Sequence, residues 1–363
     1  MEIKLYNRDL ATPELVEDLT YQVERLRFST KYHGGYNICS FRLKKDLPHA
    51  WEWITDKMFY RLVITDVTKT LWEGRVEDIG LSIGEVVVTA YGYFANLSDI
   101  PYYTAYNANA DVIIKAVLTA NCAQISADQT NIAATDIAID SAAADSYLDI
   151  YPQAIVEKVL AFSDSTFGKW YFGIWEDRVP YLIKRDDSTV NWRVSLADFT
   201  KFNLKHRAGN LWNAAYTVYR IAGVLSRTAD ADDTTSQTHY GLERKKVIPD
   251  LGEVAAGSAQ AARDAWVQDN KDIWPRLTDM VLGDTIYDTN GKAFPSSWLR
   301  AGEVLSVIDL VPSTSDLDTV ARDALRTYYI IETEYDMDRA EMRITPDKES
   351  TRLDTLLAKL VRE

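Results

Sequence analysis

The feature that most constrains this chain is a run of short strand-like segments over its first hundred residues, with turn residues about every ten positions. The segments cover residues 21–28, 36–43, 58–67, 71–79 and 86–91. Apolar and polar residues alternate within them, as in a pleated strand with one buried face. The 21 tyrosines and 10 tryptophans of the chain also favour strands, because aromatic side chains fit a half-buried pleated surface. Residues 1–104 therefore predict a first β-domain, either a sandwich or a small barrel.

Between residues 105 and 205 the apolar period changes from that of a strand to that of a helix. Asn109 and Asp111 can cap one helix, and Pro152 is well placed to begin a second. A hairpin is expected over residues 170–184, where two aromatic and apolar runs flank a charged turn. This part of the chain predicts a mixed α/β region.

Strand patterns return over residues 206–345 and predict a second β-domain. An apolar stripe predicts a helix embedded in it over residues 253–273, ended by Pro275. Asn290-Gly291 is a strong hairpin turn signal, and a last long hairpin is expected to turn at residues 336–338.

Two polar or terminal segments complete the prediction. Residues 226–238 are polar and acidic and predict a mobile loop. Residues 346–363 predict a short C-terminal helix, because four leucines fall on one face. The fold class expected for the whole chain is therefore β-rich α+β.

The charge and the cysteines restrict the class of protein. The formal net charge of −14 argues against tight binding of phosphate groups, which needs lysine and arginine. Cys39 and Cys122 are too few for a disulfide framework, and four scattered histidines make no zinc pattern. A reducing cytoplasm is the expected folding compartment. The N-terminus has no apolar signal region, and no run of 18 apolar residues predicts a membrane span.

Catalytic motifs are sparse. The sequence has no Gly-x-Ser-x-Gly elbow and no phosphate-binding glycine loop. His33-Gly34-Gly35 has a faint likeness to an oxyanion loop but lies in a strand–turn–strand pattern, which predicts a plain turn. We therefore predict that the chain is not an enzyme, with no catalytic, cofactor-binding or metal-binding residues and no cofactor.

Two charged clusters have ordinary explanations. Asp230, Asp232 and Asp233 resemble the start of a calcium loop, but glycine and glutamate are missing at the two most constrained positions, which predicts a solvated loop. The basic run 244–246 is short and predicts a solvated strand end rather than a nucleic-acid site.

Carbohydrate binding is a second possibility. Trp170, Trp175, Trp192 and Trp212 cluster in the sequence, and tryptophan faces can stack on sugars. Core and interface packing explains the same residues. A third possibility, cleavage of cell-wall polysaccharide, needs a paired set of carboxylates that 54 acidic residues cannot single out.

Two phrases of the first β-domain carry a resemblance to a known family. The first is Trp72-Glu73-Gly74-Arg75-Val76, an aromatic residue followed by a glycine–arginine–valine turn. The second begins at Gly92 and ends at Leu97. In this order and spacing they resemble the tail hub or tail-tip proteins of tailed phages, which are related in fold to the central hub of contractile baseplates.

Further segments continue the resemblance in the same order. They are a helix at 109–120, a strand at 210–219, a helix at 255–269, the Arg-x-Gly phrase of 299–305, the hairpin at 328–344 and the helix at 353–362. Residues 121–150 and 224–240 match nothing in the family. The chain also has no long extension after this last helix, so no fused peptidase or receptor-binding domain is expected.

The resemblance implies a structural role. Such hubs are homotrimers, and each chain supplies two tube-like β-barrel domains, so that three chains match a hexameric tail tube. The implied partners are the distal tail or tail tube protein, the tape-measure protein, and tip or fibre proteins. DNA would cross the lumen during ejection without sequence-specific binding. The implied location is the tail tip or baseplate of a virion made in a host cytoplasm. The alternative is a carbohydrate- or receptor-binding tail module.

Overall fold

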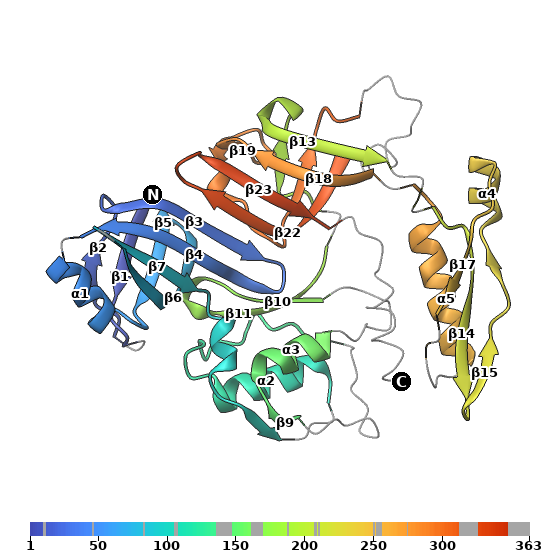
Figure 1. Cartoon of the computed structure of the whole chain (residues 1–363), viewed down its shortest axis with the longest axis horizontal. Helices are drawn as coiled ribbons and strands as arrows, with labels where there is room; N and C mark the ends of the chain where they lie inside the picture. Colours follow the sequence, from blue (N-terminus) through green and yellow to red (C-terminus); the bar gives the residue numbers. More distant parts are fainter. Residues whose placement is uncertain are drawn as a thin grey trace. The chain divides into compact units, whose positions relative to one another are not determined.

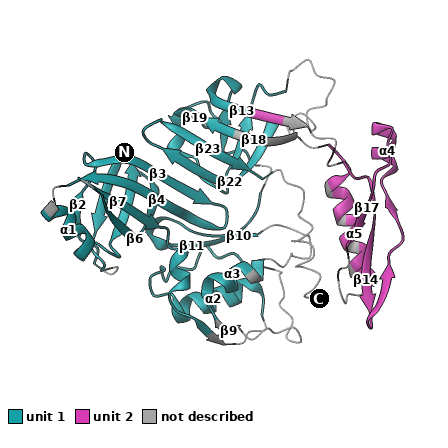
Figure 2. Ribbon diagram, viewed as in Figure 1, with its two compact units in different colours: residues 1–160, 164–202, 279–347 teal, residues 161–163, 203–278, 348–363 magenta. Residues whose placement is uncertain are grey.

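The computed structural model describes residues 1–9, 12–45, 47–82, 84–104, 108–135, 147–160, 170–186, 189–206, 209, 211–249, 251, 256–273, 275–311 and 326–347. The chain forms two compact units, shown in Figure 2. Unit 1 comprises Met1–Leu160, Asp164–Phe202 and Asp279–Asp347, and unit 2 is built mainly from Asn203–Thr278. Strands predominate over helices, which confirms the β-rich α+β fold class.

The N-terminal part of unit 1 is an antiparallel sheet that includes every strand predicted over the first hundred residues. The strands pair in the order β2–β1–β5–β6–β7–β4–β3. Alternate residues face the core, among them Leu26, Phe41 and Val86. The strands are β1 (Glu2–Tyr6), β2 (Leu15–Asp18), β3 (Val23–Lys31), β4 (Gly34–Lys44), β5 (Arg61–Asp66), β6 (Lys69–Ser82) and β7 (Glu85–Tyr91).

This region also contains a helix that the sequence patterns did not predict. Helix α1 (Leu47–Asp56) is inserted between β4 and β5, within the segment expected to hold only strands. It packs against β6 and β7 through Ala50 and Trp53, which are 1% and 2% exposed. The helix has ten residues and lies between strand patterns, so its apolar positions are too few to stand out as a helical period.

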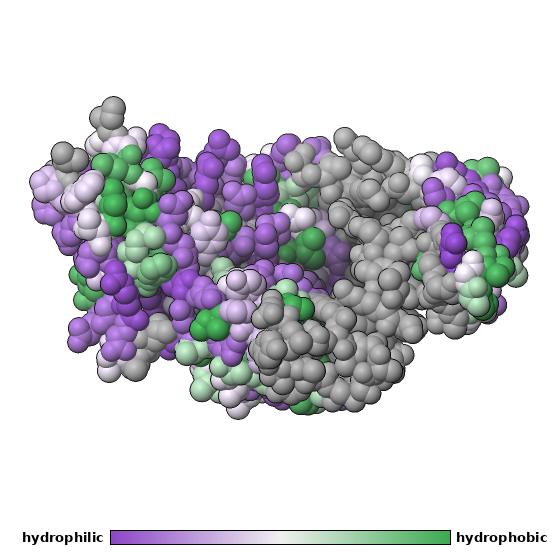
Figure 3. All heavy atoms as spheres, turned by 60° about the horizontal axis from the view of Figure 1, so that its bottom comes forward, coloured by the Kyte–Doolittle hydropathy of each residue, from purple (hydrophilic) through white to green (hydrophobic). Residues whose placement is uncertain are grey.

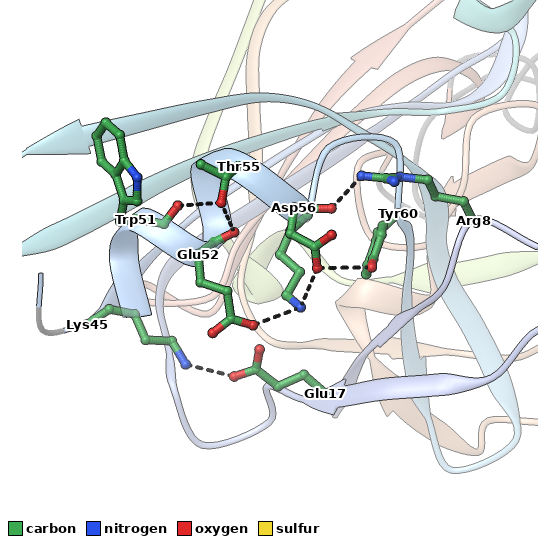
Figure 4. Close-up of polar contacts among 9 residues, drawn as sticks. Arg8, Glu17, Lys45, Trp51, Glu52, Thr55, Asp56 and Tyr60 are labelled. Carbon is green, nitrogen blue, oxygen red and sulfur yellow. Dashed lines mark hydrogen bonds and ion pairs between the residues drawn. The ribbon is translucent and has the colours of Figure 1, made fainter. Parts of the chain in front are cut away.

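Polar contacts fix the C-terminal end of α1 (Figure 4). The Arg8 guanidinium donates hydrogen bonds to the backbone carbonyls of Asp56 and, at 2.8 Å, of Met58. These carbonyls have no partner inside the helix, and a cation there also complements the helix dipole. The Lys57 ammonium lies 3.1 Å from carboxylate oxygens of both Glu52 and Asp56.

The described part of residues 105–205 contains both helices and strands. Two helices pack together, α2 (Ala110–Asn121) and α3 (Pro152–Leu160), beside the strand pair β8 (Tyr102–Thr104) and β9 (Tyr147–Ile150). The predicted hairpin consists of β10 (Trp170–Ile174), a turn at η3 (Glu176–Arg178) and β11 (Pro180–Lys184).

The cap predicted for α2 is partly wrong. Asn109 occupies the N-cap position, but its side chain makes no capping hydrogen bond. It donates instead to the carbonyl of Thr135 at 2.9 Å, and the Asp111 carboxylate accepts hydrogen bonds from the backbone and hydroxyl of Thr135. Both polar side chains therefore hold a distant segment against the helix start.

The last part of unit 1 extends the sheet. Figure 1 shows its strands beyond β3. Strand β22 pairs with β3, β23 with β22, and β18 with β23, while β21, β12, β19 and β20 continue from β22 in that order. The strands of this part are β12 (Trp192–Val194), β13 (Phe199–His206), β18 (Pro275–Leu282), β19 (Thr285–Tyr287), β20 (Ala293–Pro295), β21 (Val304–Val307), β22 (Thr327–Asp336) and β23 (Glu341–Pro346). Short 3₁₀ turns lie at η4 (Leu196–Asp198) and η6 (Ser296–Trp298) in this part, and at η1 (Ala95–Ser98) after β7.

Both hairpin turns predicted for this part are present. The loop that contains Asn290-Gly291 joins β19 to β20, and Gly291 has a positive φ of 83°. The last hairpin turns between Asp336 and Glu341, as expected. Pro346 is the last residue of β23, so the C-terminal helix does not begin there, and residues 348–363 of that prediction lie outside the described residues.

Unit 2 is a small sheet with one covering helix. Strand β14 (Ala214–Ile221) pairs with β15 (Val224–Arg227), β16 (Ala231–Asp232) and β17 (Lys245–Ile248). Helix α5 (Ala256–Asn270) packs against β14, and the predicted stripe that contains Ala259 and Trp266 is buried there. The helix ends at Asn270 rather than at Pro275, which instead begins β18.

The mobile loop predicted at 226–238 is wrong. The segment contains the end of β15, β16 and the start of helix α4 (Thr234–Tyr240). The Asp233 carboxylate caps α4 by accepting from the backbone N–H of Ser236 at 2.8 Å, and it forms an ion pair with Lys271 at 3.1 Å. The polar residues that suggested a loop are therefore capping and pairing residues.

Three further features concern the cysteines, the helices and the sheet edges of the described residues. Cys39 and Cys122 are free thiols, both buried. No described helix is long and apolar enough to cross a membrane. The described strands do not form a closed barrel, since no pairing joins β2 back to β3.

Three glycines are required by close backbone contacts. A Cβ atom at Gly92 would overlap the Tyr36 carbonyl, and one at Gly74 would overlap the Tyr91 carbonyl. A Cβ at Gly35 would overlap the Ile174 carbonyl, where β10 pairs in parallel with β4. Gly35 therefore serves sheet packing, which explains the His33-Gly34-Gly35 phrase without catalysis.

The glycine at 92 gives a direct test of this packing. We expect Gly92→Ala to lower the free energy of unfolding by about 2 kcal/mol or more, because the backbone of β4 must move. Gly80→Ala is the matched control in the same sheet, since its Cβ would be 3.9 Å from the nearest atom, the Cβ of Val87. Urea unfolding of both variants measures the difference. Equal midpoints for the two variants would contradict the packing.

Candidate functional site

The two β-rich parts of unit 1 meet at a seam between β3 and β22. Five residue pairs are in register, from Glu332 opposite Lys31 to Asp336 opposite Arg27. At its centre, the buried hydroxyls of Thr30 and Thr333 share a 2.6 Å hydrogen bond. The Thr30 hydroxyl oxygen also accepts from the backbone N–H of Ala301 at 2.9 Å. The seam therefore joins strands from opposite ends of the chain into one sheet.

Arg300, next to Ala301, makes a second polar connection between the two β-rich parts beside this seam. Its guanidinium donates to the Tyr36 hydroxyl at 3.1 Å and to the Thr70 carbonyl, and it forms an ion pair with Glu176. The guanidinium carbon lies 5.3 Å from the centre of the Trp175 ring. The side chain is only 15% exposed. One residue thus contacts β4, β6 and the turn between β10 and β11.

The Arg-x-Gly phrase of the sequence has a structural explanation at this point. Gly302 has a φ of 92°, and its N–H donates to the carbonyl of Ile330 on β22 at 2.8 Å. The Glu303 carboxylate accepts from the backbone N–H of Arg300 at 2.8 Å and from the Trp192 indole at 2.7 Å. The phrase therefore forms a tight turn that aims Arg300 into the seam.

The tryptophans considered for sugar stacking do not form an exposed platform. Trp170, Trp175 and Trp192 are 8%, 4% and 8% exposed, so their faces are covered. Trp212, in unit 2, lies under the charged groups of Arg244 and Lys246, at 4.8 Å and 5.1 Å from its ring centre. These residues pack in cores or under cations rather than presenting open aromatic faces.

A pocket of about 530 Å³ in the first β-rich part contains three arginines, and each one is paired. Arg8 donates to carbonyls at the end of α1, and Arg61 lies 3.0 Å from the buried Glu73 carboxylate. Arg75 pairs with Glu77, and with Asp99 at 2.8 Å. Burial raises the pKa of Glu73, and the attraction of Arg61 opposes this rise. Every arginine of this pocket therefore has an acceptor for its hydrogen bonds within the chain.

A second pocket, of about 500 Å³, has spare positive charge. We call it the arginine pocket; it is lined by Arg25, Arg27, Ser40, Phe41, Arg42, Val87, Asp336, Asp338 and Arg339. Arg27 pairs with Asp336 at 2.9 Å, and Arg42 pairs with Glu85 at 2.8 Å. The side chains of Arg25 and Arg339 are exposed and have no ion-pair partner among the described residues.

Backbone irregularities place these two unpaired arginines. A β-bulge between Glu24 and Arg27 sets Arg25 and Leu26 opposite a single β4 residue. Leu26 stays fully buried while Arg25, at a φ of 55°, remains on the exposed side. Arg339 lies in the β22–β23 turn beside Ala340, which has a φ of 50°. Bulges commonly redirect a side chain in this way.

The remaining charged clusters have structural roles. Asp230 pairs with Arg227 and Lys245, each at 3.0 Å, and Asp233 caps α4, so the candidate calcium loop is explained by internal contacts. The basic run at 244–246 begins β17, as the sequence predicted. Within the described part of the chain, no group of three or more metal-ligating side chains comes together.

Sequence reasoning named no site residues, and it missed the arginine pocket. Its four arginines come from β3, β4 and the last hairpin, more than three hundred positions apart at the extremes. No local motif links them. The only sequence signal is that arginines alternate with buried residues at the end of β3 and β4, which is also the pattern of any solvated face.

The comparisons with known proteins identify the fold. No protein-family model and no curated protein matches the chain. Among solved structures, the 43 kDa tail protein of prophage MuSo2 from Shewanella oneidensis is similar at 13% identity and a TM-score of 0.55, covering 98% of each chain.

Two further structures agree with this likeness. A tail protein from Neisseria meningitidis MC58 has 11% identity, a TM-score of 0.55 and 99% coverage of each chain. Prophage tail protein gp18 from Listeria monocytogenes EGD-e has 9% identity, a TM-score of 0.54 and coverage of 100% of this chain and 99% of its own. At these identities the likeness is one of fold, and it extends along the whole chain.

The contribution of the Arg300 contacts to stability can be tested by mutation. We expect Arg300→Met to lower the free energy of unfolding by about 1–3 kcal/mol, because it removes the guanidinium hydrogen bonds to Tyr36 and to the Thr70 carbonyl. Arg193→Met is the control, since that exposed side chain donates only to the Thr289 carbonyl at 3.0 Å and should change stability by less than about 1 kcal/mol. Guanidinium-induced unfolding compares the two. Indistinguishable midpoints would show that Arg300 does not hold the seam.

Proposed function

We propose that this chain is a structural hub protein of a phage tail, located at the tail tip or baseplate. The observation that carries the proposal is the likeness in fold to three prophage tail proteins, which covers 98–100% of this chain and 98–99% of theirs. A likeness of this extent includes the β-rich parts, the helices between them and unit 2, rather than one widespread domain.

The sheet edges support a ring. Among the described strands, β2 pairs only with β1, and β20 pairs only with β19, so each leaves an open edge. Leu15 on β2 is 53% exposed. Open edges with exposed apolar side chains invite pairing with another chain, and closure into a symmetric ring would cover them. We therefore infer a homotrimer.

The proposed ring has a defined place in the tail. The segments 1–104 and 206–345 would each supply a tube-like β-barrel domain once assembled, so that three copies match a hexameric tail tube. The partners would be the distal tail or tube protein, the tape-measure protein, and tip or fibre proteins. DNA would pass through the lumen, and a net charge of −14 would keep it from adhering to the wall.

No enzymatic activity is included in this proposal. The similar solved structures are described as tail proteins, and the two pockets of unit 1 hold arginines rather than a nucleophile with its base. The glycan-binding alternative loses its main support, because three of its four tryptophans are buried.

Light scattering of the purified protein, with electron-microscopic images of the same fraction, tests the proposal. We expect a particle of three times the 41.2 kDa chain mass, with a central hole. Mixing with the tube protein of the same virion is the second arm, since some rings close only on their partner. A monomer in both arms would overturn the proposal.

A further inference from the structure

The arginine pocket carries more positive charge than its own lining residues neutralise. Four guanidinium groups line it against two carboxylates, and Arg25 and Arg339 have no ion-pair partner among the described residues. In the other pocket every arginine has a partner. The chain as a whole has a net charge of −14, so unpaired positive charge in this pocket indicates a binding site for an anionic group of another molecule.

The chemistry of the lining favours carboxylates as the bound group. All four basic side chains are arginine, whose planar guanidinium matches a carboxylate with two parallel hydrogen bonds. The volume of about 500 Å³ suits a few side chains and is far too small for a DNA duplex. Phe41 and Val87 add an apolar floor. A short acidic peptide segment meets all three features.

We propose that the arginine pocket binds an acidic surface segment of a second copy of this chain and forms the copy-to-copy contact of the ring. This inference rests on the proposed function. In a closed ring each copy offers two different patches to its neighbours, so a basic patch on one face needs an acidic patch on another. With 54 acidic residues against 40 basic ones, the chain has acidic surface in excess.

The visible surface agrees with a polar contact. On the face shown in Figure 3, hydrophilic residues cover most of the coloured surface, and hydrophobic residues gather mainly in one group at the upper left and one at the right. A ring closed through charge complementarity would form quickly and weaken as salt screens the contact. It would also fix the register between copies, because like charges placed opposite each other repel.

The first test measures binding with a defined probe, a fluorescently labelled polyglutamate peptide, by anisotropy at low salt. We expect Arg25→Ala with Arg339→Ala to weaken binding by roughly 10- to 100-fold, because two guanidinium contacts are lost. The control is Lys4→Ala with Lys292→Ala, which removes the same charge elsewhere in unit 1, from Lys4, which pairs with Glu2 at 2.6 Å, and from the exposed Lys292. Equal weakening in both variants, or tighter binding of a DNA duplex of the same charge, would overturn the proposal.

The second test measures assembly by light scattering of the same variants. We expect the arginine double variant to fall to monomer while remaining folded by circular dichroism, and the lysine control to stay a trimer. A trimer that persists in the arginine variant would overturn the copy-to-copy contact even if peptide binding were lost. A wild-type protein that stays monomeric even with its tube protein would instead contradict the proposed ring. In that case the peptide test would still show whether the pocket binds carboxylates.

Discussion

The pairing of β3 with β22 is the contact on which the rest of unit 1 depends. It joins residues 303 positions apart, measured between Thr30 and Thr333, into one sheet. Pairing two strands that are so far apart in the sequence costs a large amount of chain entropy, and other contacts at the pairing must offset this cost. The buried hydroxyl pair, the Ala301 N–H and the Arg300 network all lie at this seam and supply that stabilisation. A slip of one residue would turn every side chain of β22 to the wrong face, so the hydrogen bond also fixes the register.

Local structure could largely be predicted from the sequence, since it follows from patterns of a few residues. The strands β3–β7, the 170–184 hairpin and the stripe of α5 were all predicted, because their periods of apolar residues are long enough to read. The glycine phrases can be recognised in the sequence, but the sequence does not show why glycine is needed there. Gly74 and Gly92 are needed because neighbouring backbone leaves no room for a Cβ atom, a constraint that only the paired strands reveal.

Elements whose stability comes from distant contacts could not be predicted. Helix α1 is a short helix inserted between strands, and it depends on the sheet beneath it and on Arg8, which is far away in sequence. Helix α4 and its cap resembled a loop, because Asp233 and Ser236 are equally common in both. The arginine pocket is the extreme case. Its residues form no motif, and their proximity is a product of the seam itself, because only the β3–β22 pairing brings the last hairpin beside β3 and β4.

The backbone at Arg25 separates a binding role from a stabilising one. A left-handed conformation costs a non-glycine residue on the order of 1 kcal/mol, so stability alone would favour glycine at this position. The bulge there keeps Leu26 in the core whichever residue precedes it. The arginine therefore adds strain, and its charge has no ion-pair partner among the described residues. Such a side chain is best explained by a binding partner in another molecule. A second copy of this acidic chain supplies that partner.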